Sequence, residues 1–516
     1  MKSYNLINAN IITLHDKHPI ATSLIVCNGK ISSINKVNNK LPSIDLKGAT
    51  IIPGFIDAHY HLKNYGKRLS QVNLKNTNSK QDIINRVKNK INIVDKGEWI
   101  IGFGWDQNLW QDSNFPKKDI LNNISPFNPI YLTRIDGHSA WVNDEAIKLL
   151  DIDYQNLKNI SGGKIINDCI LIDNTMNPFK SILPGDSKED TENWLKIAVE
   201  ETIKKGITGV HDAWQDGVVI NTIKELVKKN KFPLRCYGML AGSDKELLKT
   251  FFNQGHYNNE YLSIRSVKAF IDGALGSRGA ALHKPYNDDG NNCGLILITQ
   301  EEFLDLAQIC YENNFQLNTH AIGDRGNDYV LSTYQNVLSK KNDKRWRIEH
   351  AQMVSDKDIF RFKSHSILPS MQPSHCTSDM MWLSDRIGED RLPLISRWQS
   401  FINQKIKIPG GSDCPIEEGN PILEFYYAIT RQNVDGLPKG GWQPQEKITR
   451  INALKMFTKW AAFGGFNETT RGMICPGFDA DLTILSEDIL NISTTNIIST
   501  EILYTIVNGE IVYKKI

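Results

Sequence analysis

The sequence predicts an α/β fold: a (β/α)₈ barrel of the TIM type, a small β-sandwich built from both termini, and a large insertion after the first barrel strand. Three observations predict it. Eight β-rich apolar runs alternate with amphipathic helical stretches, hairpin patterns flank them at both ends of the chain, and a long interval separates the first two runs. Doubly wound sheets show the same alternation, so a count of eight favours the barrel without excluding such a sheet.

The two ends of the chain share a hairpin pattern. Residues 23–36 (SLIVCNGKISSINK) hold an Asn-Gly pair between two apolar runs, and residues 502–515 (ILYTIVNGEIVYKK) repeat the arrangement. Asn-Gly between such runs is a strong signal for a two-residue hairpin turn. We therefore predict that residues 1–50 and 470–516 pair into one β-sandwich.

The candidate barrel strands occupy the middle of the chain, within residues 51–469. In the first run, Pro53 and Gly54 interrupt the apolar pattern, so the strand is expected to begin at Phe55. No glycine-rich dinucleotide or phosphate-binding fingerprint follows any run, which argues against nucleotide-binding folds. The eight candidate strands are 51–59, 206–212, 234–240, 265–272, 315–320, 346–350, 367–372 and 405–413.

The interval 63–205, between the first two candidate strands, is far too long for a loop between a strand and a helix. It contains apolar and aromatic segments of its own at 98–110 and 129–144. We predict an inserted subdomain at about 70–185.

The composition is that of a soluble globular protein, with 40% hydrophobic and 23% charged residues. A net charge of +2 gives no support for a nucleic-acid or anionic membrane surface. No run approaches the ~20 apolar residues of a membrane helix, and the N-terminal residues lack the apolar core of a signal peptide. The eight cysteines are scattered, with no C-x-x-C pair. Reduced thiols and a cytoplasmic location are the simplest expectation.

The first candidate strand ends in three polar residues, Asp57, His59 and His61. Alternate residues of a strand share a face, which sets the two histidine Cα atoms about 6–7 Å apart. Two imidazoles at that spacing can bind one cation. Taken alone, a His-x-His pair is as consistent with a chance occurrence at a strand edge as with a metal site.

Five further residues stand at or near the ends of later candidate strands: His211, Lys268, His320, His350 and Asp413. Barrel strands end on a common face, so residues distant in sequence converge there. A lone histidine in an apolar strand is more often a buried structural residue, and we favour that interpretation for His211. The set as a whole predicts a metal site.

The chain resembles the amidohydrolase superfamily of metal-dependent hydrolases, within the subgroup often called YtcJ-like or amidohydrolase family 3. The matching motifs run from residue 53 to about 485 and so cover essentially the whole chain. They are PGFIDAHYHL, GFGWDQNLW, RIDGHSAWVN, VKAFIDGALGSRGA, THAIGDRG, RIEHAQ, GGSDCP and PGFDADLTIL. The resemblance implies a distorted (β/α)₈ barrel with a β-sandwich from both termini.

The resemblance also implies two divalent metal ions. Their ligands would be His59, His61, Lys268, His320, His350 and Asp413. The first two histidines would bind the more buried ion and the other two the second. Lys268, carboxylated on its amine by CO₂, would bridge both ions. An unmodified Lys268 would instead favour a single ion. Zinc is the expected metal, and iron, manganese or cobalt would also fit these ligands.

The resemblance and the metals together predict hydrolysis of a non-peptide, amide-type C–N bond in a small molecule. A metal-bound hydroxide would attack the carbonyl, and Asp413 would take the proton and pass it to the departing amine. A mononuclear deaminase of the same superfamily is the alternative. Such enzymes typically lack the bridging lysine and carry a glutamate soon after the fifth-strand histidine, a pattern this sequence does not show. The third hypothesis is a non-catalytic regulatory or binding protein with the same fold. Substrate, metal and oligomeric state, a homodimer included, stay open.

Several residues outside the ligand set are candidates for contact with the substrate. In the insertion, aromatic residues fit that subdomain's core equally well, and the arginines fit ordinary ion pairs. His375, just past the seventh candidate strand, is similarly open. The substrate-binding candidates are Trp105, Asp136, His138, Arg278 and Arg325.

Overall fold

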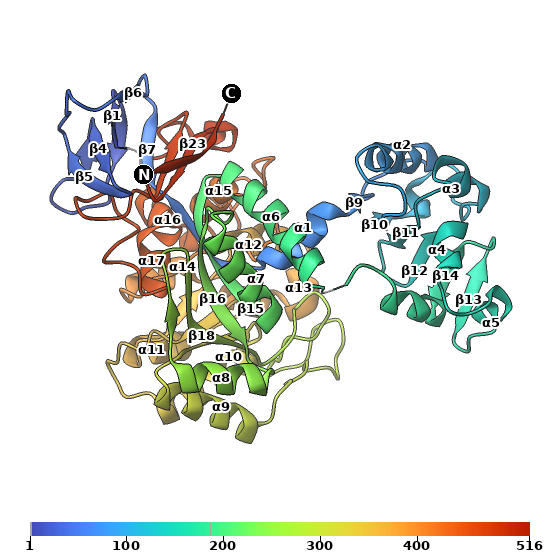
Figure 1. Cartoon of the computed structure of the whole chain (residues 1–516). Coiled ribbons are helices and arrows are strands. Elements are labelled where there is room, and N and C mark those ends of the chain that lie inside the picture. The colour runs from blue at the N-terminus through green and yellow to red at the C-terminus, as the bar shows by residue number, and fades with distance from the viewer. Residues whose placement is uncertain (1–2, 186, 516) are drawn as a thin grey trace. The chain divides into compact units, whose positions relative to one another are not determined.

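A computed structural model of the chain describes residues 3–185 and 187–515 (Figure 1). The chain forms two compact units: Met1–Leu62 together with Val199–Ile516, and Lys63–Ala198. Each unit has hydrophobic clusters of its own. Within the described ranges, no helix is both long and apolar enough to cross a bilayer.

A parallel sheet forms the barrel wall of the first unit. Among the described residues, its strands pair in sequence order, β8-β15-β16-β18-β19-β20-β21, and the short β17 (Tyr257–Asn258) joins β18 antiparallel. Every residue of β8 and β16 is buried, as expected for parallel strands covered on both faces. The strands are β8 (Phe55–Tyr60), β15 (Ile207–Gln215), β16 (Arg235–Ala241), β18 (Leu262–Phe270), β19 (Gln316–Ala321), β20 (Arg347–His350) and β21 (Leu368–Ser370).

The segment 406–414 closes the barrel between β21 and β8. Single parallel bridges join Met371 to Gly410 on one side and Tyr60 to Cys414 on the other. The sheet is therefore nearly closed, and the predicted barrel of the TIM type is confirmed in this respect.

The prediction of a regular eighth strand at 405–413 is wrong. Pro409 has no N–H to donate to a ladder, and Asp413 has a φ of 60°, which leaves the extended region. The first candidate strand divides as predicted at Gly54: β7 (Thr50–Pro53) joins a different sheet, and β8 begins at Phe55.

Helices follow the barrel strands in sequence and bury one apolar face. In α7, for example, Val219, Ile223 and Leu226 are buried, and Asp216 caps the first turn by accepting from the Val219 N–H. The helices of this unit are α7 (Gly217–Lys228), α8 (Lys245–Gln254), α9 (Gln300–Glu312), α10 (Asp324–Val337), α11 (Asp356–Ser364), α12 (Pro373–Asp379), α13 (Leu383–Ile387), α14 (Trp398–Asn403), α15 (Pro421–Thr430), α16 (Arg450–Met456) and α17 (Lys459–Gly464).

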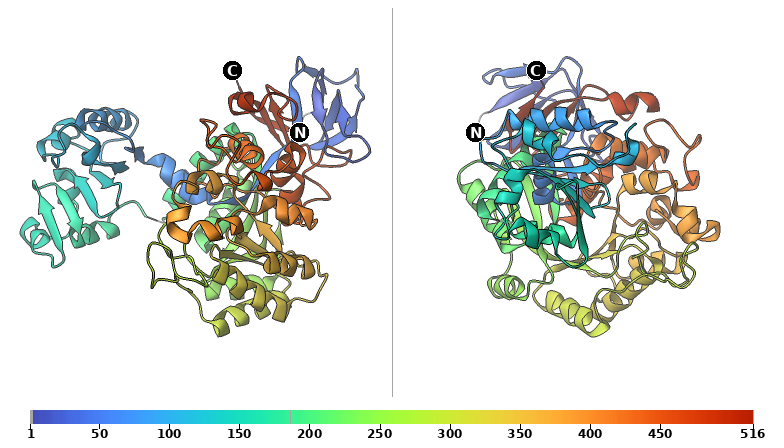
Figure 2. Two further views of the ribbon diagram at one scale, coloured as in Figure 1. Left: turned by 180° about the vertical axis from the view of Figure 1, so that it is seen from behind. Right: turned by 90° about the vertical axis from the view of Figure 1, so that its right-hand side faces the viewer.

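Strands from both chain ends form two further sheets in this unit. Their orders are β5-β4-β1-β6 and β24-β23-β22-β7-β2-β3, and one hydrophobic cluster contains residues of both sheets. The views of Figures 1 and 2 agree in placing the N-terminal (blue) and C-terminal (red) strands side by side. The strands are β1 (Tyr4–Ile7), β2 (Asn10–Ile12), β3 (Ile20–Ala21), β4 (Leu24–Cys27), β5 (Lys30–Ile34), β6 (Ser43–Asp45), β22 (Leu482–Leu485), β23 (Ile502–Val507) and β24 (Glu510–Lys514).

The second unit contains a mixed sheet of order β13-β14-β12-β11-β10-β9. Neighbouring residues of β11 belong to different clusters, Ile130 with α2 and α3 and Tyr131 with α4 and α5, because successive side chains point to opposite faces. The elements are α1 (Leu62–Ser70), β9 (Val72–Asn73), α2 (Lys80–Ile91), β10 (Ile100–Trp105), α3 (Asp119–Ile124), β11 (Ile130–Arg134), β12 (Ser139–Val142), α4 (Asp144–Lys148), α5 (Tyr154–Lys158), β13 (Gly163–Ile166), β14 (Ile170–Asp173) and α6 (Lys188–Lys204).

Candidate metal centre

The barrel brings together the predicted ligands from distant parts of the chain. One ligand atom from each of His59, His350 and Asp413 lies within 4.8 Å of the other two. His59 Nε2 is 3.5 Å from Asp413 Oδ1, and His61 Nε2 is 3.0 Å from the same oxygen. This cluster holds two imidazoles and one carboxylate, a donor set suited to a divalent cation.

Lys268 and His320 complete the group. The Lys268 Nζ lies 3.2 Å from His59 Nε2, and the His320 and His350 rings are 4.5 Å apart between centroids. Burial lowers the pKa of Lys268 to about 8, although the Glu349 and Asp413 carboxylates oppose the shift. All six predicted ligands are thus linked by direct contacts.

Burial favours the neutral, metal-binding form of His59, His320 and His350. Burial, with a further contribution from nearby cationic groups, lowers the pKa of His59 and His350 well below the usual range and that of His320 to about 3. Burial raises the pKa of Asp413, but His59 and the hydrogen bond from His61 outweigh it and leave that pKa well below its usual range. Neutral imidazoles and an ionised carboxylate are the ligand states.

The backbone is strained at two of these residues. His350 has a φ of 74° and Asp413 a φ of 60°, both in the left-handed region that non-glycine residues rarely adopt. Such conformations cost ~1–3 kcal/mol each and concentrate at functional sites. His350 is the last residue of β20, so its left-handed conformation lies where the chain leaves the sheet.

Asp57 does not belong to the cluster of candidate ligands but contacts the backbone beside it. Its carboxylate accepts hydrogen bonds from the Ser412 hydroxyl at 2.6 Å, the Ser412 N–H at 3.0 Å and the His59 N–H at 3.1 Å. Burial raises its pKa to about 7, although these hydrogen bonds oppose the shift. Asp57 therefore ties β8 to the segment that carries Asp413.

Sequence reasoning missed Glu349, which contacts His59 directly. Glu349 Oε2 is 2.6 Å from His59 Nδ1, and Arg347 lies beside it with Nη1 3.7 Å from Oε1. Arg347 Nη2 in turn donates to His211 Nδ1 at 3.0 Å. Two opposite charges two residues apart in the predicted strand 346–350 were the available signal, since alternate residues share a face.

His375 also faces the group, from α12. Its ring stacks on His350 at 5.7 Å, and its Nε2 lies 3.7 Å from Asp413 Oδ2. That nitrogen is buried and has no hydrogen-bond partner among the described residues. A cavity of about 10 Å³, room for about one water molecule, adjoins it and is also lined by Gln352 and Trp398.

The substrate-binding candidates of the second unit have partners within that unit. Trp105 is fully buried in a hydrophobic cluster and donates its indole N–H to the Leu132 carbonyl at 2.7 Å. Asp136 pairs with Arg134, and His138 Nδ1 lies 2.9 Å from Asp173 Oδ1. Their contact with a substrate stays a prediction.

The two candidate arginines of the first unit are also engaged. Arg278 binds Asp288 through two hydrogen bonds of 3.0 and 2.9 Å. Arg325 Nη2 donates to the Cys293 and Gly294 carbonyls at 3.5 Å. A substrate role for either would require these contacts to change, and it stays a prediction.

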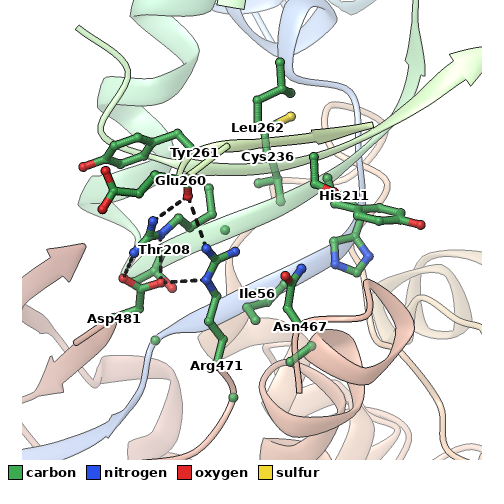
Figure 3. A pocket seen from close by; sticks show the side chains of 18 of the residues that line it. Ile56, Thr208, His211, Cys236, Glu260, Tyr261, Leu262, Asn467, Arg471 and Asp481 are labelled. Carbon is green, nitrogen blue, oxygen red and sulfur yellow. Dashed lines mark hydrogen bonds and ion pairs between the residues drawn. The ribbon is translucent and has the colours of Figure 1, made fainter. Parts of the chain in front are cut away.

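A second pocket lies at the opposite end of the strands, near the starts of β8, β15, β16 and β18 (Figure 3). Its polar lining is an ion-pair cluster in which Arg235 binds Asp481 at 3.0 Å and Arg471 binds Asp479 at 3.0 Å. His211 also lines this pocket. The paired charges make this pocket part of the junction between the barrel and the terminal strands.

Comparisons with known proteins agree with this architecture. A sequence profile of the amidohydrolase family matches residues 43–513. The chain is 31% identical over 486 residues to "Putative amidohydrolase YtcJ" of Bacillus subtilis (strain 168), covering 92% of this chain and 90% of that protein. It is 22% identical over 547 residues to the N-substituted formamide deformylase of Arthrobacter pascens, covering 100% and 99%.

A solved structure shares both fold and sequence with this chain. The crystal structure of an uncharacterized metal-dependent hydrolase from Pyrococcus furiosus is 26% identical, with a TM-score of 0.78, over 95% of this chain and 100% of that one. By these matches over most of its length, the chain belongs to the amidohydrolase family, hydrolases that act on carbon–nitrogen bonds.

Proposed function

We propose that this amidohydrolase uses divalent metal ions to hydrolyse a non-peptide, amide-type C–N bond in a small molecule. One observation carries the proposal: ligand atoms of His59, His350 and Asp413, from three separate parts of the sequence, lie within 4.8 Å of one another. The metal-dependent hydrolase from Pyrococcus furiosus, similar over the whole barrel, supports the same chemistry.

The donor set fits two divalent ions. Neutral imidazoles, a carboxylate and a carboxylated lysine suit zinc, and they also suit iron, manganese or cobalt. When bound, the ions would activate water and polarise a substrate carbonyl group. The side chains that would hold them are His59, His61, Lys268, His320, His350 and Asp413.

Asp413 is the proposed proton carrier. Its low pKa keeps the carboxylate ionised at neutral pH, and its Oδ2 is the oxygen turned away from His61, toward His375. Oδ2 accepts a proton from the attacking water and returns it to the departing nitrogen. That return is needed because an amide anion is a poor leaving group.

Lys268 is proposed to carry a carboxyl group added by CO₂. Its amine is fully buried beside His59, where burial disfavours the ammonium form. The neutral amine reacts with CO₂, and the resulting carbamate is an anionic oxygen ligand. A lysine in this position favours the two-ion hydrolase over the mononuclear deaminase.

The proposed substrate is an N-acyl or N-formyl amine, or a cyclic amide. The name of the Arthrobacter pascens relative, an N-substituted formamide deformylase, makes the N-formyl compounds the first to test.

We propose the domain organisation that the sequence predicts. The two terminal sheets would form one small β-sandwich around their common cluster, and the unit Lys63–Ala198 would be an insertion after the first barrel strand. The catalytic barrel would then comprise the remainder of the chain.

The test combines elemental analysis with hydrolysis assays over N-formyl, N-acyl and cyclic amides. We expect about two metal ions per chain and a loss of ~10²–10⁴-fold in kcat for Asp413→Asn, because proton transfer is removed. The control is His256→Ala, whose ring contacts the Asn314 carbonyl and Phe315 rather than the site. Retained turnover in Asp413→Asn would contradict the proton-carrier role. Absence of metal from protein grown with added metal and bicarbonate would favour a regulatory or binding protein.

A further inference from the structure

The contact between Glu349 and His59 joins two barrel strands that are not neighbours in the sheet. Glu349 lies in β20 and His59 in β8, and Glu349 Oε2 is 2.6 Å from His59 Nδ1. A carboxylate only accepts hydrogen bonds, so His59 Nδ1 must carry the proton. The lone pair of His59 is then on Nε2, the nitrogen that lies 3.2 Å from Lys268 Nζ and 3.5 Å from Asp413 Oδ1.

The position of the Glu349 carboxylate is unfavourable for the free energy of folding. Its side chain is 0% exposed, and its Oε1 has no hydrogen-bond partner among the described residues. A buried carboxylate with an unbonded oxygen costs free energy of folding. Among the described residues its side chain hydrogen-bonds to His59, so contact with that histidine is what its position achieves.

Arg347 compensates the charge of Glu349 and is itself fixed from three sides. Its guanidinium donates to the Ala58 carbonyl at 3.3 Å, the Gly464 carbonyl at 2.7 Å and His211 Nδ1 at 3.0 Å. The Arg347 and Glu349 side chains are both 0% exposed, and their nearest atoms are 3.7 Å apart. The pair therefore forms a rigid base for the His59 ring.

We propose that Glu349 is a positioning residue for the metal centre, one that fixes the protonated nitrogen and the orientation of His59, with Arg347 and His211 as its support. This inference rests on the proposed metal-dependent function. A carboxylate on the far nitrogen of a ligating histidine orients the ring and raises its basicity, and loss of such a partner typically weakens metal binding ~10–100-fold.

The test is zinc affinity of the apoprotein, measured by competition with a chromophoric chelator and needing no substrate. Glu349→Met keeps the side-chain length but cannot accept a hydrogen bond, and we expect its affinity to fall ~10–100-fold. Glu349→Gln keeps a carbonyl acceptor for the His59 N–H, and we expect it to recover most of that loss. The absorption spectrum of the cobalt-substituted protein should change in the Met variant and stay near that of the unmodified protein in the Gln variant.

Two controls separate positioning from general damage. Glu446→Met removes another buried glutamate, which binds Ser400 and lies 4.0 Å from Arg397, and it should leave zinc affinity unchanged. If Glu349→Met does not fold, the double variant Arg347→Met/Glu349→Met removes both buried charges and should show the same loss of affinity. Zinc binding by Glu349→Met that equals that of the unmodified protein, or an equal loss in the Met and Gln variants, would overturn the inference. Failure of the unmodified protein to bind zinc would instead refute the proposed function.

Discussion

Lys268 brings together burial, charge and reactivity in one side chain. Its amine is fully enclosed, 3.2 Å from His59 Nε2 and 4.8 Å from the centre of the Phe270 ring. A carbamate there would add a negative charge in the middle of four histidines, which divalent ions would then stabilise. Burial thus favours the neutral amine that can react with CO₂. The anionic carbamate that results would be stable in this position only with metal ions beside it.

Carboxylation of Lys268 is directly observable. Protein prepared with ¹³C-bicarbonate and metal should show a carbamate carbon resonance, and Lys268→Met should abolish it and lower metal content at least tenfold, by analogy with the ~10–100-fold effect of lost supporting contacts. Lys205→Met is the matched control, because Lys205 is another lysine whose pKa burial lowers and which lies outside the ligand set. A metal-loaded protein without the resonance would contradict the prediction.

Residues of the site differed in how far the sequence could reveal them. His59 and Asp413 stand at the ends of candidate strands, so their positions predicted a common metal site, and the family resemblance implied their roles as ligands. The charge pair Arg347–Glu349 in a predicted strand was a local signal, but the contact of Glu349 with His59, 290 positions away in sequence, could not be read from it. His211 likewise became interpretable only when Arg347 was found beside it.

At the scale of elements, the close approach of β8 and the closing segment controls the geometry of the centre. Asp413 donates its N–H to the His59 carbonyl at 2.8 Å, and Gly411 packs directly against His59. A β-carbon at Gly411 would lie 2.4 Å from the His59 nitrogen and 2.9 Å from its Cα. These are backbone atoms of a buried strand and cannot move independently of the ligand.

Gly411→Ala should therefore damage both stability and metal binding. We expect a destabilisation of ~1–3 kcal/mol, since a clash with backbone must displace β8 or the closing segment. Urea unfolding with and without chelator measures the first effect, and elemental analysis the second. Gly290→Ala, whose β-carbon would meet no atom within 4 Å, should change stability by less than ~0.5 kcal/mol. An unchanged urea midpoint in Gly411→Ala would show that the contact between the closing segment and β8 tolerates a β-carbon.

The seven regular barrel strands in the described chain overlap their predicted positions because each lies within a β-rich segment that contains buried apolar residues. The eighth could not be predicted as it is, because its extended backbone is interrupted by Pro409 and by the left-handed turn at Asp413. The left-handed turn that places Asp413 beside His59 and His61 thus interrupts the regular ladder at that segment.

At the scale of the whole first unit, an ion-pair cluster links the barrel to the terminal strands. Arg235, the first residue of β16, binds both oxygens of Asp481, which directly precedes β22. Asp479 binds Arg471 at 3.0 Å and Lys30 of β5 at 2.6 Å (Figure 3 shows Arg471 and Asp481). The cluster joins three regions that are remote in sequence.

The Asp479 carboxylate should make stability depend on acid pH. Burial raises its pKa, but the hydrogen bond from Lys30 and the charges of Arg471 and Arg235 outweigh it and leave the pKa below the usual value. A lowered folded pKa contributes stability above the unfolded value of about 3.9, and this contribution is lost as pH falls through the folded value. The free energy of unfolding should therefore decline below about pH 5, less steeply in Asp479→Asn. Glu487→Gln, at an exposed carboxylate, is the control, and parallel pH curves for Asp479→Asn and the unmodified protein would contradict the assignment.

The pairing of β7 with β22 has a consequence for biosynthesis. Pro53 of β7 pairs with Leu482 of β22, and only Gly54 separates β7 from β8, the strand that carries His59. At a synthesis rate of ~5–20 residues per second, the roughly 430 residues between these partners take about 20 to 90 seconds to be synthesised. During that time the strand with the first metal ligand is tethered to a sheet that lacks its neighbour. The sheet that holds β7, and with it the start of β8, can therefore be completed only after Leu482 has been synthesised.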